Sequence, residues 1–118
     1  MSVYSELAGM QGVIAAGEYA YRGDRYNHKG QLSDEMARMA AIMCRATTMS
    51  EHMQLAMLEQ SCPDCGGSPP VGWLVRGPAF TVCNVANVFC FIQNEAASLN
   101  QVVALMRKRL ADASHALV

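Results

Sequence analysis

Residues 33–60, a stretch without glycine or proline, most constrain what this chain can fold into. Its first residue, Ser33, can cap a helix because its hydroxyl accepts a hydrogen bond from a first-turn amide, and the two acidic residues that follow favour the positive end of the helix dipole. Apolar residues recur at helical spacing on both sides of Thr47 and Thr48, but these two β-branched polar residues weaken the pattern. The stretch therefore predicts a long helix that is interrupted or kinked near this pair.

Shorter elements flank the long helix. β-Branched and aromatic residues on either side of Arg22-Gly23-Asp24 predict a β-hairpin, and three apolar runs after Pro70 predict three consecutive strands. We expect a short helix over residues 3–11 and a last helix from Ser98, whose spacing to Gln101 fits a capping box. The order predicts an α+β fold (α-β-β-α-β-β-β-α), in which the long helix and the terminal helices pack on a five-stranded, mainly antiparallel sheet.

Charge and hydropathy narrow the classes of function. The 118 residues are 52% hydrophobic and 16% charged, and this composition argues against disorder. The formal net charge of −1 gives no general attraction to nucleic acid. No apolar run approaches the roughly 20 residues that span a bilayer, and no basic cluster precedes an apolar segment at the N-terminus. We therefore expect a cytoplasmic protein that folds as one domain over residues 1–118 and binds neither nucleic acid nor membrane.

Six of the nine methionines lie in the predicted long helix. Methionine is flexible and polarizable, so it fills gaps in a core and also suits surfaces that accept a partner helix. Because these residues spread over more than one face of the helix, we expect some to pack on the sheet and others to form a subunit interface. The candidate interface residues are Met36, Met39, Met43, Met49, Met53 and Met57.

The segment Cys62-Pro63-Asp64-Cys65 permits three interpretations. A redox pair needs a thiol of lowered pKa, usually at a helix N-terminus in a thioredoxin-like context, whereas this pair follows a helix and precedes strands. A zinc site would use Cys62 and Cys65 and needs two more ligands, from Cys83 and Cys90, from His52, or from a second subunit. The simplest interpretation is a turn in which the thiols have no chemical role. Five cysteines without a secretory signal also argue against a disulfide framework.

The other candidates for chemistry are isolated in the sequence. We expect Cys44, Cys83 and Cys90 to fill the core as small apolar residues. The three histidines stand alone, the sequence has no phosphate-binding loop, which disfavours nucleotide binding, and the basic run Arg107-Lys108-Arg109 fits a solvated helix end. We therefore expect a protein that is not an enzyme and has no cofactor apart from the zinc that Cys62 and Cys65 could bind.

Two segments carry a resemblance to a known family. Residues 12–49 contain an early Gly-Val-Ile-Ala-Ala-Gly-Glu strand and a Gly-x-Leu-Ser-x-Glu-Met start of the long helix. Residues 72–92 contain a Gly-Trp strand followed by Val-Cys and Asn-Val. The chain thereby resembles the roadblock (dynein light-chain) superfamily, and more closely a bacterial roadblock-like family of uncharacterised function. The resemblance implies a roadblock-like fold that dimerises through a sheet edge and the long helix, and it implies no catalytic residues.

The resemblance also suggests what such a dimer serves. It implies a scaffold or regulator, often near small GTPases, and some bacterial relatives are associated with sulfur-oxidising systems that resemble heterodisulfide reductase. The leading hypothesis is therefore a non-catalytic homodimer that binds a protein partner in a larger cytoplasmic assembly. The alternative hypothesis is a thiol module, in which Cys62 and Cys65 bind zinc, cycle through a disulfide or carry sulfur.

Overall fold

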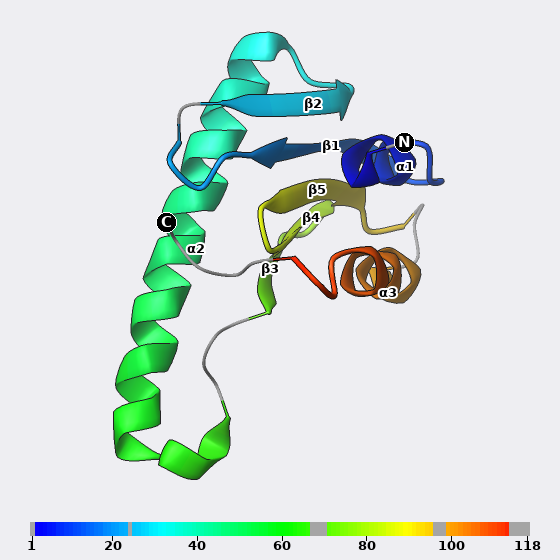
Figure 1. Cartoon of the computed structure of the whole chain (residues 1–118). Helices are drawn as coiled ribbons and strands as arrows, with labels where there is room; N and C mark the ends of the chain where they lie inside the picture. The colour runs from blue at the N-terminus through cyan, green and yellow to red at the C-terminus, as the bar shows by residue number, and fades with distance from the viewer. Residues whose placement is uncertain (1, 24, 67–70, 96–98, 114–118) are drawn as a thin grey trace.

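A computed structural model of the chain describes residues 2–23, 25–66, 71–95 and 99–113 and confirms the predicted order of elements (Figure 1). The Ser33 hydroxyl caps the long helix as expected, because it accepts a hydrogen bond from the Met36 amide at 3.1 Å. The predicted start of the last helix at Ser98 lies outside the described residues. The elements are α1 (Val3–Ala8), β1 (Val13–Tyr19), β2 (Tyr26–Gly30), α2 (Asp34–Ser61), the short 3-10 helix η1 (Pro63–Cys65), β3 (Gly72–Arg76), β4 (Phe80–Val85), β5 (Val88–Gln93) and α3 (Leu99–Arg109).

The five strands form one antiparallel sheet in the order β2-β1-β5-β4-β3. β1 and β2 pair as one hairpin, and β3, β4 and β5 pair in chain order as a second unit. The non-local pairing of β1 with β5 joins these two units. The predicted five-stranded sheet is therefore confirmed. β2 and β3 are its edges, and each edge strand turns one row of backbone amides and carbonyls away from the sheet.

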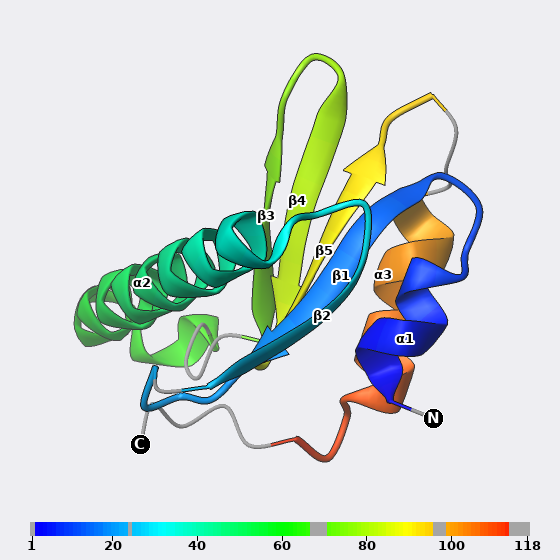
Figure 2. The same cartoon turned by 90° about the horizontal axis from the view of Figure 1, so that it is seen from above.

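The sheet lies between two helical layers. α2 covers one face, and α1 and α3 lie on the other (Figure 2). On the second face, Leu7 of α1 and Val102 and Met106 of α3 pack over Cys90 and Ile92 of β5, and none of these five residues is more than 1% exposed. The larger of the two core clusters therefore lies on this face.

The side of α2 that packs on the sheet consists of small residues, not methionines. All six methionines of the helix are at least 38% exposed, so the prediction that some of them pack on the sheet is wrong. Small side chains let the helix backbone lie close to the strands, where large aromatic residues such as Tyr19 and Phe89 fill the space beneath it. The buried residues of α2 are Ala37, Ala41, Cys44 and Thr48.

α2 is continuous from Asp34 to Ser61, so the predicted interruption near Thr47 and Thr48 is not present. The Thr47 hydroxyl donates a hydrogen bond to the Met43 carbonyl, at 3.0 Å, one turn earlier in the helix. Thr48 is 6% exposed and its hydroxyl is used in tertiary hydrogen bonds. Tertiary contacts and a hydrogen bond within the helix thus outweigh the low helix propensity of threonine.

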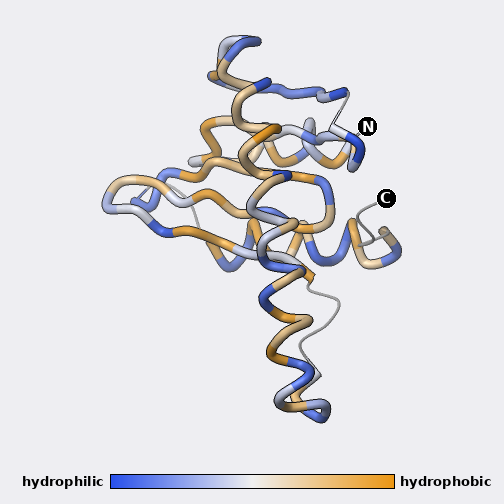
Figure 3. Tube along the Cα trace, turned by 90° about the vertical axis from the view of Figure 1, so that its left-hand side faces the viewer, coloured by the Kyte–Doolittle hydropathy of each residue, from blue (hydrophilic) through white to orange (hydrophobic). Residues whose placement is uncertain are grey.

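The C-terminal part of α2 projects past the sheet (Figures 1 and 3). We call residues 49–61 the projecting segment; it contains none of the buried residues of the helix. At 1.5 Å per residue it is about 20 Å long, and an isolated helix of this length is marginally stable in water. Within the described residues, no helix is both long enough and apolar enough to cross a membrane.

Candidate functional site

An apolar groove lies beside α2 on its face of the sheet. The groove has a volume of about 830 Å³. Met36, Met39 and Met43 line it from the helix, and Phe80 and Phe91 line it from the sheet. Met36 and Met43 are 59% and 62% exposed. A groove of this size and character is typical of a surface that binds another protein segment.

β3 adds an apolar strand edge to this groove. Val71, just before the strand, and Leu74 and Val75 within it are between 49% and 58% exposed. The opposite edge strand, β2, has the polar sequence Tyr-Asn-His-Lys-Gly. Apolar edges invite pairing with another strand, whereas polar and charged edges discourage it. The two edges therefore differ, and β3 is the one suited to association.

The projecting segment adds further exposed apolar side chains. Met53, Met57 and Leu58 are 68%, 69% and 54% exposed. Met53 and Met57 are one turn apart on the same side of the helix. We call the groove, the β3 edge and the projecting segment together the apolar surface.

A buried polar network holds α2 against β3 and so keeps the groove in shape. The Thr48 hydroxyl accepts a hydrogen bond from Trp73 Nε1 at 2.8 Å and lies 3.0 Å from the Tyr19 hydroxyl. Tyr19 also donates to Asn84 Oδ1 at 3.1 Å, and Asn84 Nδ2 donates to the Ala86 carbonyl at 2.9 Å. Burial raises the pKa of Tyr19 to about 12, so this tyrosine stays protonated at neutral pH.

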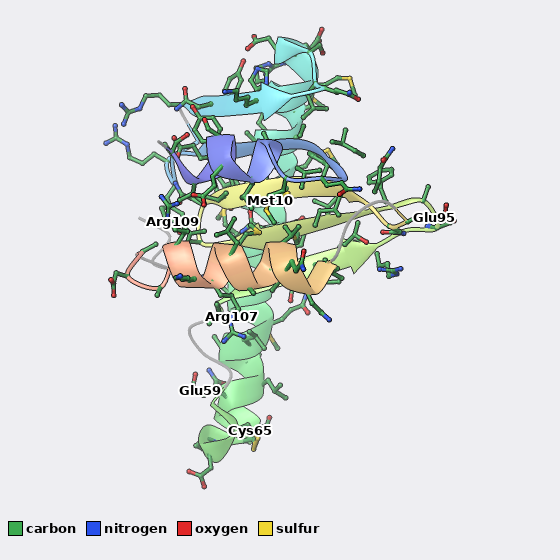
Figure 4. All side chains as sticks on the ribbon, turned by 90° about the vertical axis from the view of Figure 1, so that its right-hand side faces the viewer. Met10, Glu59, Cys65, Glu95, Arg107 and Arg109 are labelled. Atoms are coloured by element: carbon green, nitrogen blue, oxygen red, sulfur yellow. A yellow bond between two sulfur atoms is a disulfide. The ribbon has the colours of Figure 1, made fainter. Side chains whose placement is uncertain are left out.

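Cys62 and Cys65 form a disulfide at the far end of α2, where η1 turns the chain back (Figure 4). Cys65 is exposed and Cys62 is half-buried. As a disulfide the pair cannot supply the two thiolates that the zinc hypothesis requires. Among the residues that the structure describes, no group of three or more His, Cys, Asp or Glu residues could hold a metal ion. Residues 67–70, which follow the Cys62–Cys65 segment, lie outside that part.

The other three cysteines are free and buried, which confirms that they pack in the core. Cys83 and Cys90 lie opposite each other on β4 and β5, and their hydrogen bond, together with burial, raises the pKa of the Cys90 thiol. Burial also raises the pKa of Cys44 to about 12. Thiols held in the protonated form are poor nucleophiles and poor metal ligands. Cys83 is 2% exposed and Cys90 is fully buried, so neither is placed to complete a site with the half-buried Cys62 and exposed Cys65.

The structure brings together residues that the sequence did not mark as functional. Leu74 and Val75 point to opposite faces of β3, as neighbours in a strand do. Two adjacent apolar residues are typical of a strand that is covered on both faces. The pattern therefore did not indicate that Leu74 and Val75 are exposed. They are exposed because β3 is an edge strand, and its place in the sheet depends on non-local pairing. The sheet residues of the apolar surface that sequence reasoning missed are Val71, Leu74, Val75 and Phe80.

Comparisons with known proteins agree with this architecture. A crystal structure of a Roadblock/LC7 domain from Streptomyces avermitilis superposes on the chain with a TM-score of 0.57 at 14% sequence identity, and the match covers 92% of this chain and 95% of that one. At this identity the likeness shows the fold, which confirms the predicted roadblock-like architecture. A search of curated proteins finds no match. Residues 4–108 match the family described as "Uncharacterized conserved protein (DUF2173)". The chain therefore belongs to the DUF2173 family and has a roadblock-like fold.

Proposed function

We propose that this protein is a non-catalytic dimerising scaffold or regulatory subunit, which uses the apolar surface to bind a second copy of itself. The single observation that supports this best is the projecting segment of α2. Residues 49–61 contain none of the buried residues of α2, and they present Met53, Met57 and Leu58 to solvent. A helix end of this kind is stabilised when another subunit covers it.

The sheet edge supports the same proposal. Antiparallel pairing of β3 with β3 of a second copy would satisfy the outward backbone groups of both strands and continue the sheet across the dimer. A two-fold axis between the strands would also place the two α2 helices on the same side of the joined sheet. Each copy would then contact the other through the same surface, as a symmetric dimer requires.

The assembled dimer presents a surface to a further protein in a larger cytoplasmic assembly. Resemblance to bacterial roadblock-like proteins provides two contexts for that partner, a small GTPase or a sulfur-oxidising system similar to heterodisulfide reductase. Capture of partners by the tagged dimer from cells, followed by mass spectrometry, distinguishes the two contexts.

Sedimentation equilibrium of the wild-type protein tests the association directly. We expect a mass equal to two chains across the micromolar range, because a surface with this much exposed apolar area favours a closed complex. A monomer at high protein concentration would contradict the proposed function.

A second candidate function, a thiol module, is supported by the disulfide between Cys62 and Cys65. The pair is accessible at the end of the projecting segment, whereas the three free cysteines are buried. Reduction by an external dithiol would move two electrons and two protons to the pair and leave the donor as a disulfide. The resulting thiols could bind zinc, or one of them could take the outer sulfur of a persulfide donor, which leaves as a thiol.

Alkylation of the native protein tests this candidate. We expect no labelling of Cys62 and Cys65 in the oxidised protein and labelling of both after mild reduction, with Cys44, Cys83 and Cys90 protected until the protein is denatured. Peptide mass spectrometry reads each site, and the mass of the intact protein reports bound zinc or added sulfur. If Cys62 and Cys65 of the reduced, metal-free protein resist alkylation, the thiol module has no basis.

A further inference from the structure

Four arginines converge on a pocket on the flank of α2. The pocket has a volume of about 360 Å³ and lies between the β1–β2 loop and the helix. Arg22 and Arg25 come from the loop, and Arg38 and Arg45 come from α2. Four of the nine basic residues of the chain thus line one pocket, although the formal net charge of the chain is only −1.

The loop is held in place against the helix. Arg45 Nε donates a hydrogen bond to the Tyr21 carbonyl, and the loop lies beside α2 (Figure 1). The Gly23 amide donates to the Ala20 carbonyl at 2.8 Å, and the Ala20 amide donates to the Arg25 carbonyl at 2.9 Å. Gly23 has a φ of +80°, and a Cβ there would lie 3.3 Å from Arg45 Nε. These hydrogen bonds fix the backbone of the loop and the Arg45 side chain before any ligand binds.

Negative charge is scarce in this pocket. No acidic side chain is among the described residues that line it, and within that part of the chain Arg25 and Arg38 form no ion pair. Asp34 lies nearby but accepts a hydrogen bond from the Tyr26 hydroxyl at 2.9 Å and approaches His28 Nε2 at 3.6 Å. Asp24, between the two loop arginines in the sequence, lies outside the described residues. Arg25 and Arg38 thus bring two positive charges to the same pocket, and a bound anion lowers the repulsion between them.

We propose that this pocket binds a small molecule that carries phosphate groups, most simply a diphosphate. Guanidinium groups match phosphate oxygens with paired, charge-assisted hydrogen bonds, which makes arginine the residue best suited to this ligand. The aromatic and apolar side chains of Tyr26 and Ile42 line the same pocket and offer contact to an organic part of the ligand. The absence of a phosphate-binding loop in the sequence does not bear on this site, because side chains and not loop amides would hold the phosphates.

The pocket is separate from the apolar surface. Arg38, Ile42 and Arg45 lie on one flank of α2, whereas Met36, Met39 and Met43 line the groove on another. Dimerisation through the apolar surface therefore leaves the pocket open. If the pocket binds no anion, the measured mass of the dimer is unchanged. If the protein is a monomer, the pocket can still bind an anion.

Calorimetric titration of the purified chain with inorganic pyrophosphate at low, fixed ionic strength tests the proposal. We expect saturable binding with one site per chain in the wild type. In the double variant Arg25→Gln/Arg38→Gln binding should weaken roughly tenfold or more, because each charge-assisted hydrogen bond to phosphate is lost without a neutral replacement. Both residues are exposed, so the fold should survive, and thermal melting checks that it does.

The matched control is Arg107→Gln/Lys108→Gln, which removes the same charge from exposed positions on α3, on the other face of the sheet. This variant should bind pyrophosphate as the wild type does. Amide shifts in NMR spectra should cluster at residues 20–25 and 38–45. Absence of saturable binding, equal weakening in both double variants, or shifts confined to other regions would each overturn the proposal.

Discussion

Replacing Met53 and Met57 with glutamate will convert the proposed dimer into monomers. The two side chains are 68% and 69% exposed in the single chain, and the proposed dimer covers them. Each new carboxylate would have to lose its water on association without a cation to replace it. We expect the dimer to weaken roughly a hundredfold or more, equivalent to about 3 kcal/mol, while the monomer keeps its fold. Sedimentation equilibrium across a range of concentrations measures the change.

Two control variants separate the apolar contact from other effects. Gln54→Glu/Gln60→Glu adds the same charge to the same exposed part of α2 but replaces polar residues, and it should leave the dimer largely intact. Cys62→Ser/Cys65→Ser removes the disulfide and should also leave a dimer. If the methionine variant still sediments as a dimer, the projecting segment is not part of the interface.

Alkaline pH will destabilise the fold through Tyr19. Burial raises its pKa from the ordinary value of 10.0 to about 12, so the folded protein holds the proton more tightly than the unfolded chain does. The stability linked to this proton is fully present below pH 10 and is lost as the pH rises from 10 to 12. A shift of this size corresponds to about 2 to 3 kcal/mol of the free energy of unfolding. Burial raises the pKa of Cys44 as well, which extends the window down to pH 9.

Urea unfolding at a series of pH values compares the wild type with Tyr19→Phe. At neutral pH the variant should be less stable by about 1 to 3 kcal/mol, because Asn84 Oδ1 loses its buried donor. The two stability curves should then converge as the pH approaches 12, since the variant lacks the tyrosine proton. Tyr4→Phe, which removes a hydroxyl from α1 outside the network, should run parallel to the wild type. Parallel curves for Tyr19→Phe would show that Tyr19 is not the group responsible.

Most of the architecture could be predicted from local patterns, because each element has a clear boundary signal. Ser33 starts α2, and Gly23 and the Ala86-Asn87 turn separate the paired strands. The orientation of α2 could not be predicted in the same way. Apolar residues occur around its whole circumference, so periodicity does not show which side packs on the sheet. The choice depends on the size of the residues opposite, and Phe89 and Tyr19 leave room only for alanine, cysteine and threonine.

The site was harder to predict than the fold because its parts are distant in the sequence. The methionines indicated an interface on α2, but β3 joins it only through the pairing of β3 with β4. The arginine pocket had no signal at all, since Arg22 and Arg25 lie in a turn and Arg38 and Arg45 lie two turns apart on a helix. Such pairs have no motif spacing, and the overall charge of −1 conceals their concentration.

The unlike edges of the sheet limit how far self-association can proceed. Pairing of β3 with β3 consumes that edge on both copies, and the joined sheet then ends on both sides at β2. The side chains of Asn27 and Lys29 on this strand are both exposed. A charged, solvated edge does not recruit a third chain readily. In the proposed dimer, β3 would thus be the edge that pairs and β2 the edge that does not, so that assembly would end at two subunits and would not continue into a filament.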